Sequence, residues 1–422
     1  MHYPLRRCLG VPDLQARDVR PAAPLLTRIR LASPLDRWCL SKLVQLVSDV
    51  PVQFVLWDGT TARAGDGLPR FTVHLASRGA LWRLARDPDL GFGEGYVDGD
   101  VRVDGDMPAL VDAVAGAVAV RGWQMGRVHR WLAHGSGAGI LAARRNAQHH
   151  YDLGNDFYRL WLDEDLVYTC AYFPTPDASL EAAQRAKLEH VCNKLQLAPG
   201  LRVFEAGCGW GALARHMARA HGALVRAWNV SHEQLVEARA RTAAEGLDDR
   251  VEFVDDDWRS IDGTCDVFAS VGMLEHVGRS HYGDLGRVID RCLHPRHGRG
   301  LLHFIGRDVE APASRWTRRY VFPGFYLPTL REVLAGVLEP YGLSVVDVED
   351  LRRHYTRTLE HWHDRFERAA PRVTAEYGEP FTRLWRYYLA GAHAGFAAGY
   401  LQLFQVTFAR RGWDGGAWRR IA

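Results

Sequence analysis

Lysine is scarce in this chain, and its cysteines follow no ligand spacing. Of the 53 basic residues only Lys42, Lys187 and Lys194 are lysines, and 50 acidic residues leave a formal net charge of +3. So small an excess gives no argument for a nucleic-acid partner. The seven cysteines contain no CxxC pair. This absence argues against a metal site and a disulfide framework, and it favours a reducing compartment.

Long apolar runs are missing as well. The most apolar stretch, residues 395–409, is shorter than the ~18–20 residues of a membrane span and contains Gln402 and Gln405. The arginines near the N-terminus are not followed by an apolar core with a small-residue cleavage site, so we expect no secretory signal. These absences predict a cytoplasmic protein that does not span a membrane.

The composition, 47% hydrophobic and 24% charged over 422 residues, is that of a folded protein of two or three domains. We predict an N-terminal arm, a small α+β domain, a basic linker and a large C-terminal domain, over residues 1–35, 36–120, 121–145 and 146–422. In the small domain, residues 52–57 and 71–75 are rich in β-formers and predict strands.

The C-terminal domain alternates between apolar, β-rich runs and stretches with helical spacing. The runs lie at residues 201–206, 223–230, 251–254, 265–271, 300–305, 343–348 and 401–408. Helical spacing separates the first five, for example over residues 234–244. This alternation predicts an α/β fold with a doubly wound, mostly parallel sheet.

A glycine-rich turn follows the first of these strands. Glu205 ends the strand, and Gly207, Gly209 and Gly211 follow in the pattern G-x-G-x-G before a helix that begins near Ala212. Glycines let a ligand approach bare backbone, and an acidic residue can bind a cationic or hydroxyl-bearing ligand. The spacing differs from the dinucleotide fingerprint G-x-G-x-x-G and favours S-adenosylmethionine (AdoMet) over NAD. A plain strand-to-helix turn is the alternative.

Polar residues also follow the next two strands. Asn229, Ser231 and Gln234 follow the second strand, where a ribose would lie. Asp257 follows the third and offers a carboxylate to an adenine amino group, while Trp258 offers an indole for stacking. Ligands of open α/β sheets bind at the carboxyl ends of the strands, where these loops converge. For the acidic residues a solvated turn is the alternative.

Seven motifs then occur in one order. They are residues 150–157 (HYDLGNDF), 168–173 (YTCAYF), 205–211, 270–278, 301–306, 320–328 and 354–359. In this order they resemble the cyclopropane fatty acid synthases, a family that includes the mycolic acid cyclopropane synthases. The resemblance implies a seven-stranded, Rossmann-like AdoMet-dependent methyltransferase domain with an acyl-chain pocket. Residues 92–100 (FGEGYVDGD) resemble the accessory domain of the phospholipid-acting members.

The resemblance implies transfer of a methylene group from AdoMet to the cis double bond of an unsaturated phospholipid acyl chain, with bicarbonate as the base. The bicarbonate ligands of the family match Cys170, Glu275, His303 and Tyr355, which we take as catalytic, and the backbone of Ile305. Tyr168 and Thr169 match cofactor-binding positions. The residues alone leave alternatives open: Cys170 as a structural thiol and His303 as a core histidine. A lone buried Glu275 is harder to explain structurally.

Several positions depart from the family pattern. Trp228 and Asn229 replace usual residues of the second-strand loop, and we expect them to reshape the ribose pocket. Phe304 replaces a threonine and should narrow the bicarbonate site, and Ala392 replaces a cysteine. These departures keep two alternatives open: a C-methyltransferase with a methyl-branched or methylene product or a non-phospholipid alkene substrate, and a non-catalytic lipid- or AdoMet-binding protein.

A lipid substrate predicts peripheral association with the inner face of the cytoplasmic membrane. Arginines interleaved with apolar residues give one candidate surface in the linker: Arg121, Trp123, Arg127, Arg130, Trp131, Leu132, Arg144 and Arg145. A second candidate is Arg315, Trp316, Arg318, Arg319 and Tyr320. A solvated helix face is the alternative for the first. The resemblance further implies a homodimer, and a reductase partner if the product is methyl-branched.

Overall fold

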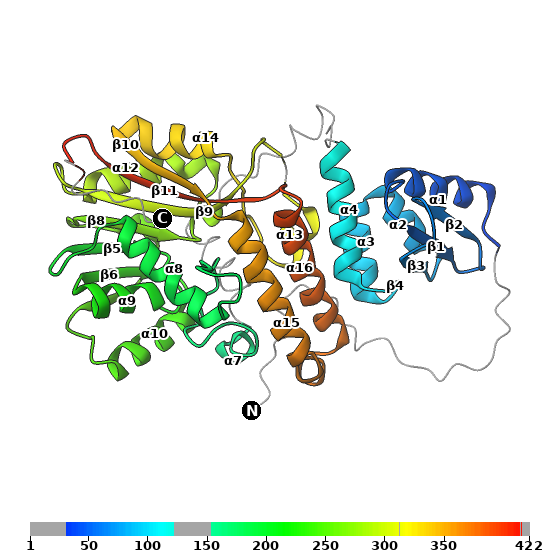
Figure 1. Cartoon of the computed structure of the whole chain (residues 1–422), viewed down its shortest axis with the longest axis horizontal. Helices are drawn as coiled ribbons and strands as arrows, with labels where there is room; N and C mark the ends of the chain where they lie inside the picture. The colour runs from blue at the N-terminus through cyan, green and yellow to red at the C-terminus, as the bar shows by residue number, and fades with distance from the viewer. Residues whose placement is uncertain (1–30, 122–152, 312, 414, 416–422) are drawn as a thin grey trace. The chain divides into compact units, whose positions relative to one another are not determined.

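The computed structural model describes residues 31–121, 153–311, 313–413 and 415. Contacts group the chain into two compact units (Figure 1). The first comprises the described residues within 1–124, 314–323 and 366–398, and the second those within 125–313, 324–365 and 399–422. The predicted C-terminal domain, residues 146–422, included residues 314–323 and 366–398, which group with the first unit in the structure. Most of the predicted arm and linker lies outside the described residues.

The first unit contains a four-stranded sheet. Its strands are β1 (Val52–Leu56), β2 (Thr61–Ala64), β3 (Phe71–Leu75) and β4 (Val101–Asp104), in the order β2-β1-β3-β4. β1 and β3 are parallel and the outer pairings antiparallel. Buried residues alternate with partly exposed ones along β1 and β3, so one face of the sheet packs into the core. The short polar β2 was not predicted.

Helices complete the described part of the first unit. They are α1 (Pro34–Leu46), α2 (Arg78–Arg86), α3 (Pro88–Asp98), α4 (Met107–Arg121), α13 (Arg315–Tyr320) and α16 (Glu379–Ala397), together with residues 366–377 of the long helix α15 (Arg352–Tyr377). The glycines of α3 permit close packing, because a Cβ on Gly93 would lie 2.3 Å from the Trp316 ring and one on Gly95 2.5 Å from Val101. Ala392, one of the departures from the family pattern, lies on α16 and is partly exposed.

One residue of the second candidate membrane surface, Trp316, is buried by this packing. Trp316 is 2% exposed, and its ring meets that of Tyr387 edge-on at a centroid distance of 4.7 Å. Arg315 pairs with Asp87. Trp316 is therefore part of the core of the first unit, and the prediction that it anchors the protein in a bilayer is wrong.

The second unit is built on a seven-stranded sheet. Its strands are β5 (Arg202–Ala206), β6 (Leu224–Asn229), β7 (Val251–Asp255), β8 (Val267–Val271), β9 (Arg299–Gly306), β10 (Leu343–Asp350) and β11 (Gln402–Arg410). Their order is β10-β11-β9-β8-β5-β6-β7, and only β11 runs antiparallel to its neighbours. All seven predicted strands are confirmed.

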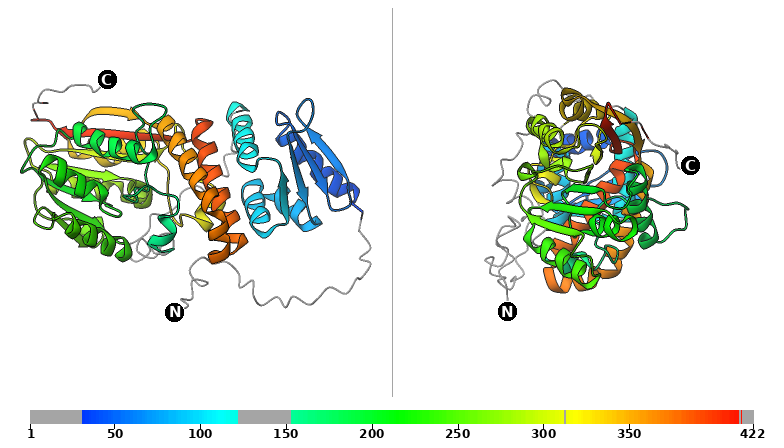
Figure 2. Two further views of the ribbon diagram at one scale, coloured as in Figure 1. Left: turned by 60° about the horizontal axis from the view of Figure 1, so that its bottom comes forward. Right: turned by 90° about the vertical axis from the view of Figure 1, so that its left-hand side faces the viewer.

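Helices cover both faces of this sheet (Figures 1 and 2). They are α7 (Asn155–Tyr158), α8 (Leu180–Lys194), α9 (Ala212–His221), α10 (His232–Ala244), α11 (Leu274–Val277), α12 (Tyr282–Cys292), α14 (Leu330–Val333) and the first part of α15 (Arg352–Tyr377). Short 3-10 or π turns are η3 (Trp258–Ser260), η4 (Arg279–His281), η5 (Leu334–Leu338) and η6 (Glu339–Tyr341). Val203 packs with α8, α9 and α10, and Phe204 with α12 and η5. The sheet is therefore doubly wound, as predicted.

Among the described residues, no helix combines the length and the hydropathy that a membrane span requires.

Candidate active site

The glycine turn lies at the carboxyl end of β5. Gly207, Gly209 and Gly211 have φ angles of 84°, 54° and 75°, which residues with a Cβ rarely adopt. A Cβ on Gly211 would also lie 2.6 Å from the Phe253 ring. The Gly207 N–H donates to the carbonyl of Trp228 over 2.9 Å and ties the turn to the end of β6. Bare backbone is thus held where ligands bind in open α/β sheets.

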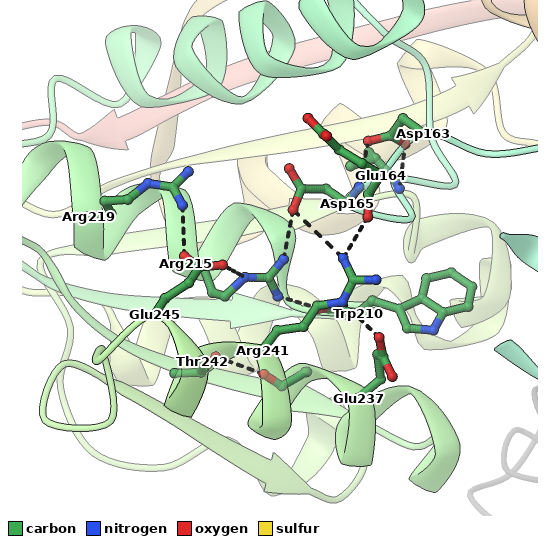
Figure 3. Close-up of polar contacts among 12 residues, drawn as sticks. Asp163, Glu164, Asp165, Trp210, Arg215, Arg219, Glu237, Arg241, Thr242 and Glu245 are labelled. Carbon is green, nitrogen blue, oxygen red and sulfur yellow. Dashed lines mark hydrogen bonds and ion pairs between the residues drawn. The ribbon is translucent and has the colours of Figure 1, made fainter.

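A buried arginine of α9 braces this turn (Figure 3). Arg215 is 1% exposed, and its Nη1 donates to the carbonyl of Trp210 over 2.7 Å. Its other two nitrogens donate to Asp165 Oδ1 at 3.0 Å and to Glu245 Oε1 at 2.9 Å. Every nitrogen of the guanidinium group therefore has a partner, and the turn is fixed to the 163–165 loop and to the end of α10.

Glu205 is the acidic residue that precedes the turn. It is 2% exposed, and burial raises the pKa of its carboxyl to about 7, although the charges of Lys187 and Arg215 act in the opposite direction. Its Oε2 is buried without a hydrogen-bond partner in the described part of the chain. A buried carboxyl oxygen without a partner is costly, so it is suited to accept a hydrogen bond from a ligand.

The loop after β6 supports the turn from the other side. Asn229 Nδ2 donates to the carbonyl of Gly209 over 3.2 Å and to Gln234 Oε1 over 2.8 Å. The hydroxyl of Ser231 is buried and has no partner among the described residues. Asn229 and Gln234 therefore position the glycine turn, while Ser231 offers a group to a ligand.

Two departures from the family pattern lie in the core rather than in the site. Trp228 is 2% exposed and packs edge-on against Phe204 at a centroid distance of 5.0 Å. Phe304 is fully buried, with its ring 5.7 Å from that of Phe404. Because successive strand residues face opposite sides of a sheet, Phe304 faces away from His303. The expectations that Trp228 reshapes the ribose pocket and Phe304 narrows the bicarbonate site are wrong.

Asp257 and Trp258 lie at the start of η3, after β7. Asp257 is 2% exposed, and both its carboxylate oxygens bind Arg259 Nη1, at 2.9 and 3.0 Å. The Arg259 guanidinium lies over the Trp258 ring, 4.4 Å from its centroid. The Asp257 carboxylate is thus already paired, and adenine binding by these two residues stays a prediction.

Two buried residues of α8 hold the segment with Tyr168 and Thr169. Lys187 Nζ donates to Thr169 Oγ1 over 3.0 Å, and Gln184 Nε2 to the Thr169 carbonyl over 2.9 Å. Burial lowers the pKa of Lys187 to about 8. The Tyr168 ring lies 5.3 Å from that of Trp362. Lys187 and Gln184 were not predicted from the sequence, although a lysine on a helix of a lysine-poor chain is a usable signal.

Cys170 and Tyr355 lie near each other at the start of α15, where Tyr355 is in the first turn of the helix. Cys170 is fully buried, and its thiol donates to the carbonyl of Ala171 over 3.1 Å. The carbonyl of Leu351 lies 3.9 Å from Cys170 Sγ and accepts the Tyr355 N–H over 3.1 Å. Burial raises the pKa of the Cys170 thiol far above its usual range, so it is a neutral thiol rather than a nucleophilic thiolate.

Glu275 lies on α11, directly after β8, and contacts β9. It is 6% exposed, and its Oε1 accepts the Ile305 N–H over 2.6 Å. Burial raises the pKa of Glu275 to about 7, against the lowering effect of that bond. Its Oε2 has no partner among the described residues. The Ile305 N–H, predicted as a bicarbonate ligand, is therefore bound to Glu275 in this structure.

His303 lies two residues before Ile305 on β9. It is 2% exposed, and Gln405 Nε2 lies 3.1 Å from its Nδ1. Burial lowers the pKa of His303 well below its usual range, with a contribution from Lys187, so the ring is neutral at pH 7. With Nδ1 accepting from Gln405, Nε2 carries the hydrogen, and it has no partner in the described chain. The charge of Lys187 also acts to lower the pKa of Cys170, against the larger effect of burial.

Comparisons with known proteins agree with this geometry. Residues 141–406 match the family described as mycolic acid cyclopropane synthetase, and residues 39–118 match a domain of unknown function (DUF7884). A probable fatty acid methyltransferase of Pseudomonas putida is 36% identical over 376 residues, which cover 87% of this chain and 93% of the relative. The cyclopropane-fatty-acyl-phospholipid synthase of Escherichia coli K12 is 37% identical over 337 residues, 78% of this chain and 85% of the relative.

One similar solved structure contains S-adenosylhomocysteine, the molecule that remains when AdoMet has given up its methyl group. The mycolic acid cyclopropane synthase CmaA1, complexed with S-adenosylhomocysteine and CTAB, superposes with a TM-score of 0.60 at 29% identity, over 63% of this chain and 98% of that chain. The match of the family over more than half of the chain shows that the protein belongs to the mycolic acid cyclopropane synthetase family and is an AdoMet-dependent methyltransferase.

Proposed function

We propose that this enzyme transfers a methylene group from AdoMet to the cis double bond of unsaturated phospholipid acyl chains and forms a cyclopropane ring, with bicarbonate as the base. The observation that carries the proposal is a pair of buried atoms, Glu275 Oε2 and His303 Nε2, that have no hydrogen-bond partner among the described residues. Buried polar groups are nearly always bonded, so the pair is suited to a small polar ligand.

The two side chains fit bicarbonate. The neutral His303 ring donates from Nε2, and Glu275, whose pKa is raised to about 7, accepts from Oε2 in its ionised form. Bicarbonate has oxygens that accept and one hydroxyl that donates, so it can satisfy both atoms. When bound, it supplies a base for the proton that ring closure releases. Glu275 and His303 would fix its orientation, which is electrostatic preorganisation.

The remaining residues hold the electrophile and exclude water. AdoMet supplies the methyl group as a sulfonium, which reacts with an alkene only when the two are held close together. Glu205 Oε2 and the Ser231 hydroxyl, both buried without a partner among the described residues, lie on the loops that frame the glycine turn and would bind it. Cys170 and Tyr355 are 0% and 8% exposed. Such a dry environment protects a carbocation from quenching by water.

The proposal is tested on the purified protein with AdoMet and vesicles of monounsaturated phospholipid, with and without bicarbonate. We expect S-adenosylhomocysteine and acyl chains that have gained one CH₂, with the ring identified by NMR, and slower turnover after bicarbonate is removed. His303→Ala should lose the bicarbonate dependence. The control His297→Ala removes a histidine that pairs with Asp266 and is half exposed, and it should keep the dependence. Turnover that never responds to bicarbonate contradicts the assigned base.

A second candidate product is an open-chain methyl or methylene group. It is favoured by the Pseudomonas putida relative, a probable fatty acid methyltransferase matched over 93% of its length. The same incubation decides between the two, because NMR distinguishes ring protons from a methyl branch. A methyl-branched product would also require a reductase partner.

We further propose that the enzyme acts as a homodimer at the inner face of the cytoplasmic membrane and binds no nucleic acid. The basic residues predicted to contact anionic lipid, from Arg121 to Arg145, lie in a segment whose side chains are outside the described residues. Co-sedimentation with anionic and with neutral vesicles tests the contact, and it should be stronger and salt-sensitive with anionic lipid. Equal binding to both contradicts an electrostatic contact.

A further inference from the structure

Four side chains with metal-ligand chemistry meet between α8 and α9, outside the site described above. Glu189 and Cys192 are three residues apart on α8 and therefore share a face. His216 lies in the middle of α9, and His221 is its last residue. The ligand atoms of Cys192, His216 and His221 all lie within 4.8 Å of one another. None of these residues has a role in the proposed reaction.

The two imidazoles converge on a single point. His216 Nε2 lies 3.0 Å and His221 Nε2 3.1 Å from the same atom, Glu189 Oε2. The side chains of His216 and His221 are 13% and 16% exposed, that of Glu189 is 44% exposed, and Cys192 is fully buried. The cluster thus reaches from the core to the surface, which gives an ion a path of entry.

We propose that these four residues bind Zn²⁺. One thiolate, two imidazoles and one carboxylate are the donor types that zinc takes in tetrahedral sites, at about 2.0–2.3 Å. Such a tetrahedron places ligand atoms about 3.5 Å apart. The atoms of Cys192, His216 and His221 lie within 4.8 Å of one another and must therefore approach by at most about 1.3 Å, while the two imidazole nitrogens move slightly away from Glu189 Oε2. On binding, the Cys192 S–H bond breaks, an S–Zn bond forms and one proton leaves to solvent.

Four protein ligands leave no open position, so the site is structural rather than catalytic. It would join α8, whose Lys187 and Gln184 hold Thr169, to α9, which begins directly after Gly211. His221 lies at the end of α9 away from that turn, and His216 lies in the middle of the helix. Zinc should therefore raise the thermal stability of the second unit without taking part in methyl transfer. The sequence predicted no metal site, because its cysteines contain no CxxC pair and these ligands come from two separate helices.

The test is a titration of the full-length, chelator-treated protein with Co²⁺ and then Zn²⁺. We expect one Co²⁺ per chain, a thiolate-to-cobalt charge-transfer band with the visible bands of tetrahedral cobalt, and displacement by Zn²⁺. Calorimetry in buffers of different ionisation enthalpy should show about one proton released per Zn²⁺. Zinc should also raise the melting temperature of the wild-type protein.

Matched variants locate the site. Cys192→Ser should abolish the charge-transfer band, and His216→Gln or His221→Gln should weaken binding about tenfold or more. The controls are Cys292→Ser, a buried cysteine on α12, and His232→Gln, an exposed histidine paired with Asp255, and both should bind as the wild type does. The two histidine variants keep the proposal testable if Cys192→Ser does not fold. Absence of saturable one-to-one binding, or a charge-transfer band that survives Cys192→Ser, overturns it.

Discussion

The polar network around Arg215 and the pair formed by Glu275 and His303 are both buried in the second unit, but their hydrogen bonding differs. Every guanidinium nitrogen of Arg215 has a partner in the protein (Figure 3). Glu275 and His303 each bond through one atom and leave the other, Oε2 or Nε2, without one among the described residues. Burial alone therefore does not mark a ligand site; Glu275 and His303 are distinguished because each also keeps a polar atom without a partner among the described residues and lies at a position where the family motifs match. Arg215 is a supporting residue, and Glu275 and His303 are the ligand-directed ones.

Removal of the Arg215 guanidinium group, whose nitrogens all have hydrogen-bond partners, should have the largest effect on stability. Arg215→Met leaves Asp165 and Glu245 without their buried partner and should lower the free energy of unfolding by about 3 kcal/mol or more. Arg219→Met is the matched control, because Arg219 binds the same Glu245 at 2.7 Å but is 54% exposed, and its loss should cost about 1 kcal/mol or less. Denaturant unfolding measures both. Equal losses of unfolding free energy in the two variants would contradict the supporting role assigned to Arg215.

Removal of the Glu275 carboxyl group, whose Oε2 has no partner among the described residues, should instead affect turnover. Glu275→Gln keeps an oxygen for the Ile305 N–H but loses the carboxylate charge, so turnover should fall about 100-fold or more while AdoMet affinity stays the same. Methyl transfer to lipid vesicles and isothermal titration with AdoMet measure the two quantities. Glu310→Gln, at a half-exposed ion pair with Arg279, serves as the control. Unchanged turnover in Glu275→Gln would remove it from the reaction.

The raised pKa of Glu275 makes a smaller, pH-dependent prediction. Its carboxyl titrates at about 7 in the folded protein, against an ordinary value of 4.5. Between these values the folded state holds a proton that the unfolded state has released, so this group's contribution to stability is fully present below pH 4.5 and is lost as the pH rises to 7. The melting temperature of the wild type relative to Glu275→Gln should therefore fall over this range. A difference that is constant with pH contradicts the shift.

The smallest effect is expected at Phe304. Phe304→Leu keeps the core apolar on the face of β9 opposite His303, so it should cost about 1 kcal/mol of stability and leave the product unchanged. Product analysis by NMR and thermal unfolding check the two parts. A new product in this variant would mean that Phe304 reaches the acyl chain after all.

Much of the fold could be predicted, because its signals are local. The seven apolar runs of the second unit are separated by stretches with helical spacing, and all seven are strands in the structure. The glycines of the turn after β5 have the positive φ angles that their residue type indicates. The face on which Phe304 lies could also have been read from the alternation along β9, since His303 precedes it.

The candidate site was predicted only in part. Family motifs pointed to Glu275 and His303, but the sequence did not show that Glu275 binds the Ile305 N–H or that Gln405 binds His303. Asp257 was expected to face adenine, whereas its carboxylate is paired with Arg259. Each of these contacts depends on a partner that lies on another element or on the exact course of a turn.

The sequence by itself determined the alternation of strands and helices, the glycine turn and the residue types of the site, because strand periodicity and the conformational freedom of glycine act over a few residues. Only the tertiary structure decided which buried polar atoms are satisfied. Lys187 meets Thr169 of the preceding segment, and Cys192 lies beside His216 and His221 because α8 and α9 pack on the same face of the sheet. Hydrogen bonds and metal ligands act over a few ångströms, so they depend on packing between elements that are distant in sequence.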